Sequence, residues 1–79
     1  MKYVYILKSV QYPSKHYVGS TNDLKRRLKE HNSGHTTHTN KYKPWKLITY
    51  LAFDEPRKAD KFEEYLKSGS GRTFAKNHF

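Results

Sequence analysis

Tyr3-Val4-Tyr5-Ile6-Leu7 is a short run of aromatic and aliphatic residues that contains neither a charge nor a breaker. Such a run predicts a β-strand that is buried on both faces. Pro13 and Ser14 then indicate a turn. Residues 16–19 form a second short strand, and we expect it to pair with the first as a hairpin.

Downstream of the hairpin the pattern changes to a helix, a loop and a third strand. A helix is predicted over residues 24–32, because Asn22 and Asp23 offer an N-cap and Gly34 offers a left-handed stop. Residues 35–43 are polar and without period, which indicates a loop. Residues 45–53 alternate in polarity, and this pattern predicts a strand that becomes buried towards its end.

The last third of the chain is predicted to be helical. Residues 54–56 place two acids and a proline at a helix start. Ala59, Phe62 and Leu66 follow at helical spacing and form one apolar stripe. We expect Gly69 to end this helix and a short basic helix to continue to residue 79. The order β-β-α-β-α-α predicts a single α/β (α+β) domain over residues 1–79.

The charge balance indicates a polyanionic partner. The 79 residues include 16 Lys+Arg against 7 Asp+Glu, a formal net charge of +9. This excess favours DNA or RNA, and an acidic membrane surface less so. No apolar run reaches the ~20 residues of a membrane span, so we expect no membrane insertion. The absence of cysteine excludes a disulfide framework and fits a cytoplasmic location.

The predicted first helix places two chemically useful residues on one face. At ~100° per residue, His31 lies within about 40° of the direction set by Leu24 and Leu28, and Arg27 lies within about 80°. Both are expected at the rim of the buried surface. This arrangement is compatible with a solvated basic helix, in which Arg27 extends along the edge, and with a functional pair.

Glu63 and the tyrosines leave similar alternatives open. Glu63 lies about 70° from the centre of the apolar stripe of its helix, so its carboxylate needs a cation or a metal as partner. Arg27 or Lys67 could supply the cation, and a single carboxylate also suits Mg²⁺. Tyr5 and Tyr17 lie on the two hairpin strands. Each can be a core residue, or its hydroxyl can orient or deprotonate a water.

These separate signals occur in an order that resembles the GIY-YIG nuclease family. The resemblance rests on residues 3–5, on Tyr17-Val18-Gly19, on Arg27 and His31, and on Glu63. Residues 17–34, 43–47 and 66–72 are especially similar to its small, single-domain bacterial members, and the family includes the nuclease domain of the excision-repair nuclease subunit. Two positions depart from the pattern. The first motif lacks its glycine, and Ser20 stands where the excision-repair subunit has a lysine.

The resemblance implies a three-stranded antiparallel sheet flanked by helices, and a metal-dependent endonuclease acting on DNA. Glu63 would hold one Mg²⁺ or Mn²⁺ ion. Tyr5 and Tyr17 would flank the scissile phosphate, one of them acting on the attacking water. Arg27 would stabilise the transition state, and His31 would assist proton transfer or hold Tyr5.

We expect DNA binding to rest on backbone contacts, with structure-selective or weakly sequence-selective cleavage. Candidate phosphate contacts come from eight basic residues: Lys25, Arg26, Lys29, Lys41, Lys43, Lys46, Arg72 and Lys76. The main alternative is a non-catalytic nucleic-acid-binding module on the same fold. Another is a basic RNA- or ribosome-associated protein, whose aromatic residues would stack on single strands.

Overall fold

The chain is organised around a three-stranded antiparallel sheet. In the computed structural model, which describes residues 1–79, its strands are β1 (Lys2–Ser9), β2 (His16–Thr21) and β3 (Trp45–Phe53). The order across the sheet is β2-β1-β3, so β1 is central and β2 is an edge strand. Tyr5, in the middle of β1, pairs with Gly19 of β2. This hairpin register fixes which side chains of the two strands share a face.

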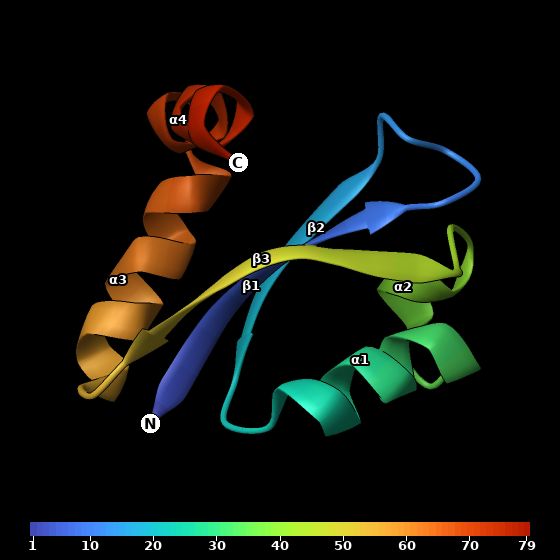
Figure 1. Ribbon diagram of the computed structural model, residues 1–79, viewed down its shortest axis with the longest axis horizontal. Coiled ribbons are helices and arrows are strands. Elements are labelled where there is room, and N and C mark those ends of the chain that lie inside the picture. The colour runs from blue at the N-terminus through green and yellow to red at the C-terminus, as the bar shows by residue number, and fades with distance from the viewer.

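Four helices complete the fold, and they divide between the two faces of the sheet (Figure 1). They are α1 (Leu24–Ser33), α2 (Thr37–Asn40), α3 (Pro56–Lys67) and α4 (Gly69–His78). Asp23 caps α1 by accepting a hydrogen bond from the Arg26 backbone N–H, and Gly34 ends the helix at φ 85°. Both cap residues are those expected from the sequence. None of the helices is long and apolar enough to cross a bilayer.

The alternation of side chains along β1 creates a separate core on each face. Val4 and Ile6 pack with residues of α3, including Ala59 and Leu66. Tyr5 and Leu7 point to the other face, where they form a cluster with Trp45 and the half-buried leucines of α1. The four residues from Val4 to Leu7 are all buried, as the uncharged sequence of this strand predicts.

The predicted order of the main elements is confirmed, with one helix added. Thr37–Asn40 form the single turn α2 inside the segment predicted to be a loop. This turn has no periodic sequence signal, and tertiary contacts hold it. Thr39 is buried, and its carbonyl accepts a hydrogen bond from the indole N–H of Trp45 at 2.8 Å.

Two further expectations are corrected at the ends of elements. β3 does not become buried towards its end; its one buried residue is Trp45 at the start, where α1 and α2 cover the sheet. Gly69 opens α4 and does not close α3, because Ser68 caps the new helix by accepting from the Gly71 N–H at 3.2 Å. A Cβ at position 71 would lie 1.7 Å from the Tyr65 carbonyl oxygen, so this tight corner requires glycine.

Candidate active site

Tyr5 begins a hydrogen-bonded chain that crosses the α1 side of the molecule. Its side chain is 2% exposed, and its hydroxyl lies 2.8 Å from His31 Nε2. His31 is fully buried in α1, with Nδ1 2.8 Å from the hydroxyl of Thr39 in α2. The centre of the β1 strand is therefore tied to two helices. His31 does not lie at the rim, as predicted, but at the centre of the buried face of α1.

The same network assigns the protons of His31. The Thr39 hydroxyl donates to the carbonyl of Thr36 at 3.4 Å, which leaves its oxygen to accept from Nδ1–H. Nε2 is then unprotonated and accepts the Tyr5 hydroxyl proton. Burial lowers the pKa of His31, and the charge of Arg27 lowers it further. The imidazole is therefore neutral at physiological pH, with one acceptor nitrogen directed at Tyr5.

Gly19 allows the two tyrosines to approach each other. The rings of Tyr5 and Tyr17 lie 6.2 Å apart, and the Tyr17 ring lies 4.8 Å from that of His31. A Cβ on Gly19 would lie 2.6 Å from the Tyr5 hydroxyl oxygen and 2.8 Å from Tyr17 Cε2. No larger residue fits without displacing a phenol. Tyr17 remains half-buried on the edge strand, whereas Tyr5 is enclosed.

Arg27 places a cation at the mouth of this cluster. Its guanidinium lies one helical turn before His31, is 35% exposed, and donates to Glu30 Oε1 at 3.1 Å. Burial raises the pKa of Tyr5 to about 12, although the neighbouring guanidinium acts in the opposite direction. The contacts with Tyr5 and Glu30 in turn raise the pKa of Arg27. Tyr5 is therefore protonated at neutral pH, and Arg27 is charged.

Glu63 approaches the edge strand β2 from the α3 face of the sheet, which is opposite to the face of the tyrosine cluster. Its carboxylate, carried by α3, accepts hydrogen bonds from the Ser20 hydroxyl at 2.7 Å and from Lys67 Nζ at 2.9 Å. Burial alone would raise the pKa of Glu63, but these two hydrogen bonds and the charges of Lys67 and Lys2 bring it below its ordinary value. The carboxylate is therefore ionised. Ser20 directly follows Gly19, so the residue that binds the Glu63 carboxylate and the residue against which both phenols pack are neighbours on β2.

The carboxylate of Glu63 fits a divalent ion that keeps most of its waters. No group of three or more His, Asp or Glu side chains lies close enough to enclose a metal. A carboxylate has about four acceptor positions, and Ser20 and Lys67 use one on each oxygen. Mg²⁺ commonly binds through one or two carboxylates, retained waters and a substrate phosphate. The donor set therefore fits Mg²⁺ or Mn²⁺ and does not fit an ion that needs a complete protein cage.

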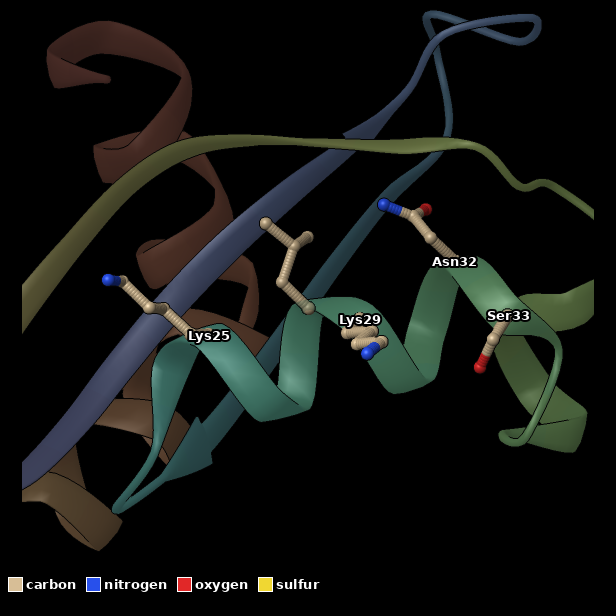
Figure 2. Close-up of a pocket in the computed structure, with 5 residues that line it drawn as sticks. Lys25, Lys29, Asn32 and Ser33 are labelled. Carbon is tan, nitrogen blue, oxygen red and sulfur yellow. The ribbon is translucent and has the colours of Figure 1, made fainter.

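The predicted phosphate-contact residues come from elements on both sides of the sheet. All eight are exposed, but they come from α1, the α2–β3 segment, β3 and α4. Lys25 and Lys29 line a shallow hollow on α1, where Figure 2 shows Asn32 turned towards β3. The Asn32 amide binds the backbone of Trp45 through both its oxygen and its nitrogen. That residue is therefore structural, and the hollow contains none of the candidate catalytic side chains.

Sequence reasoning missed two residues of the site. By comparison with the excision-repair subunit Ser20 lacks a cation, yet its hydroxyl orients Glu63. Its position directly after Gly19 was an available signal. Thr39 fixes His31 from a segment predicted to be an irregular loop, and no sequence pattern identifies it. Of the two ion-pair partners that the sequence offers for Glu63, Arg27 and Lys67, the structure shows Lys67.

The neutral, buried His31 predicts that the fold loses stability in acid. Unfolded imidazole titrates near ~6.5, and the lowered pKa of His31 means that the unfolded chain binds this proton first. The contribution of His31 to the free energy of unfolding is therefore complete above about pH 6.5. It is lost as the pH falls, by up to about 1.4 kcal/mol per pH unit. Thermal unfolding at pH 7.5 and 5.5 should show a decrease in Tm of about 4–8 °C for each kcal/mol of stability that is lost.

The pH dependence can be assigned to His31 by substitution. In His31→Gln this contribution to the decrease in Tm should disappear, whereas the exposed His38 offers a matched control in His38→Gln. An equally steep decrease in His31→Gln would contradict the assignment. A histidine NMR titration of the unaltered protein measures the same pKa if the variant does not fold.

The chain is similar in sequence and in fold to known proteins. The GIY-YIG catalytic domain family matches residues 1–77. A UPF0213 protein of Clostridium perfringens is 40% identical over 68 residues, covering 85% of this chain and 71% of that protein. The solution NMR structure of a UPF0213 protein from Bacillus halodurans superimposes with a TM-score of 0.57 at 33% identity, covering 96% of this chain and 81% of the other.

Fungal nuclease subunits are also similar over much of the chain. The structure-specific endonuclease subunit SLX1 of Candida dubliniensis is 37% identical over 71 residues, covering 81% of this chain. The chain spans only about a quarter of that protein, 25% of its length. The match over residues 1–77, together with the fold shared with the Bacillus halodurans protein, places the chain in the family. The chain belongs to the GIY-YIG catalytic domain family.

Proposed function

We propose that the chain is a divalent-metal-dependent endonuclease that hydrolyses DNA phosphodiester bonds with structure selectivity or weak sequence selectivity. What supports this proposal is that Tyr5, Tyr17 and Arg27 lie together on the α1 side of the β1–β2 pair, and that Ser20 of the same edge strand binds the Glu63 carboxylate. An ionised carboxylate on a chain of net charge +9 would repel DNA unless a cation lies between them. The SLX1 relatives, named as structure-specific endonuclease subunits, support an endonuclease that selects its substrate by structure.

Glu63 would hold the ion, with Ser20 keeping the carboxylate in place. When bound, Mg²⁺ or Mn²⁺ supplies charge that polarises the phosphate and stabilises the leaving 3′ oxygen. Lys67 occupies one carboxylate oxygen, but its side chain is 54% exposed and can move into solvent. Lys67 would thus preserve the ionised form of Glu63 until the ion and the DNA arrive.

Tyr5 and His31 together provide a path for the proton of the attacking water. With a pKa of about 12, Tyr5 is not an effective base by itself. In our proposal the water gives its proton to the Tyr5 oxygen as the Tyr5 proton moves to His31 Nε2, 2.8 Å away. The new P–O bond forms as the P–O3′ bond breaks, and the leaving oxygen takes a proton from solvent. The more exposed Tyr17 would position the water.

Arg27 would act on the phosphoryl group. A guanidinium donates two parallel hydrogen bonds to phosphate oxygens, and Arg27 is paired with Glu30 beside the tyrosine cluster. Negative charge on the non-bridging oxygens increases in the transition state, so a fixed bidentate donor stabilises it more than the ground state. The exposed lysines and arginines would hold the DNA backbone without reading its sequence.

Cleavage of matched substrates tests the proposed function. We expect end-labelled flap or branched DNA to be cut with Mg²⁺ or Mn²⁺ at least about 10-fold faster than linear duplex of the same sequence, since this difference corresponds to only about 1.4 kcal/mol of selective binding. Samples with EDTA provide the control. Salt-sensitive binding without cleavage in either ion would contradict catalysis and favour the non-catalytic binding module. Preferential cleavage of a matched RNA would contradict the DNA assignment.

A further inference from the structure

A groove lies on the α3/α4 side of the sheet, and Tyr17 is the only one of the proposed catalytic residues that lines it. It has a volume of about 960 Å³ and runs between the sheet and α4. Its floor is apolar and includes Ile6, Val18, Ile48 and Leu66. In Figure 1 its walls correspond to α4 and the β1–β2 hairpin. We call this feature the α4 groove.

The α4 groove combines positive charge with exposed apolar surface. Its bases are Lys15, His16, Lys67, Arg72 and Lys76, and no Asp or Glu is among the lining residues. Ile48 is 36% exposed and Phe79 is 42% exposed, so part of the apolar lining is open to solvent. Duplex DNA presents a charged backbone and keeps its bases stacked inside. A single strand presents both phosphates and free base faces, which matches this mixed lining.

The α4 groove also connects with the proposed catalytic site. Lys67 lines the groove and donates to Glu63 at 2.9 Å. Tyr17, from the edge strand, belongs to the lining as well. Arg72 and Lys76 lie further along α4, one helical turn apart on the same face. A strand leaving the neighbourhood of Glu63 would therefore meet cations along this path.

We propose that the α4 groove binds a single-stranded arm of the DNA substrate, with phosphates on Arg72 and Lys76 and bases against Phe79 and Ile48. The proposal rests on the proposed nuclease function and names the part of a branched substrate that the protein recognises. The groove would thus favour a junction or flap over a continuous duplex, because only the former supplies an unpaired strand next to the cleavage point.

Binding without metal tests the α4 groove independently of catalysis. The probe is a fluorescein-labelled thymidylate oligonucleotide of about 12 nucleotides, within the range that one single-strand-binding module covers, and its anisotropy is measured in EDTA. Arg72→Ala/Lys76→Ala removes two cations from the groove. Arg57→Ala/Lys58→Ala removes the same two residue types from an exposed turn of α3 that does not line the groove. The groove variant should bind about 10-fold more weakly, and its salt slope should fall by about 1.4.

The outcomes separate the groove from the proposed reaction. The control pair should bind the oligonucleotide within about 2-fold of the parent protein, since exposed charges far from the ligand contribute mainly through a screened field. Equal losses in both pairs, no loss in the groove variant, tighter binding of a matched RNA, or no binding by the parent would each overturn the proposal. If the groove variant loses binding but the parent cuts no DNA, the groove stands and the nuclease assignment fails.

Discussion

Glu63→Gln should reduce the rate of DNA cleavage by at least about 1,000-fold, equivalent to about 4 kcal/mol of transition-state stabilisation. Glutamine has nearly the same shape and can still accept the Ser20 hydroxyl, so the packing of α3 against the β2 edge is retained. The change removes the negative charge, which in our proposal attracts the divalent ion to the scissile phosphate. Initial cleavage rates on branched DNA at saturating Mg²⁺ measure the effect.

The neighbouring Glu64 provides a matched control for this substitution. Glu64 is exposed on α3, whereas Glu63 is half-buried at the sheet edge. Glu64→Gln changes the net charge equally and should leave the cleavage rate within about 2-fold, as expected for a surface charge in water. Calorimetric titration with Mn²⁺ should show weaker binding in Glu63→Gln only. A Glu63→Gln protein that folds and cuts DNA at the parental rate would eliminate the proposed metal role.

The fold could be predicted where local chemistry determines local structure. The uncharged run at the start of the chain can be stable only as a buried strand, and it became the centre of the sheet. Asp23 and Gly34 mark the ends of α1, because a side-chain cap and a left-handed residue are local requirements. α2 could not be predicted, because its single turn depends on Thr39 and Trp45 meeting across the chain.

The candidate site could be predicted only in part, because its contacts join residues that are far apart in the sequence. Helical geometry placed Arg27 and His31 on one face of α1 without revealing that His31 is fully buried between Tyr5 and Thr39. The bond from Ser20 to Glu63 joins residues 43 positions apart in sequence. Such a contact depends on how α3 packs on the sheet, and no periodicity within either segment encodes it. Family resemblance suggested Glu63, and the structure adds the partners that hold its carboxylate.

Arg27 is the cation whose position distinguishes it from the other basic residues of the chain. The eight predicted phosphate contacts are exposed, whereas Arg27 is half-buried against Tyr5 and paired with Glu30. The pair with Glu30 therefore limits the motion of its guanidinium before substrate arrives. A donor that is already oriented loses little freedom when charge develops on a phosphate, and this preorganisation gives electrostatic catalysis its large effect.

Arg27→Lys should slow cleavage by about 100-fold or more, the cost of removing one preorganised donor, while DNA binding changes little. Lysine keeps the positive charge and can still pair with Glu30, but it cannot donate two parallel hydrogen bonds to one phosphate. Arg26→Lys is the control, because Arg26 is exposed one position earlier on α1, and its rate should stay within about 2-fold, as expected for a surface charge. Single-turnover rates and binding in EDTA separate the chemical step from affinity. If both variants lose the same rate, or if Arg27→Lys loses only binding, Arg27 serves as another backbone contact and not as the stabiliser of the transition state.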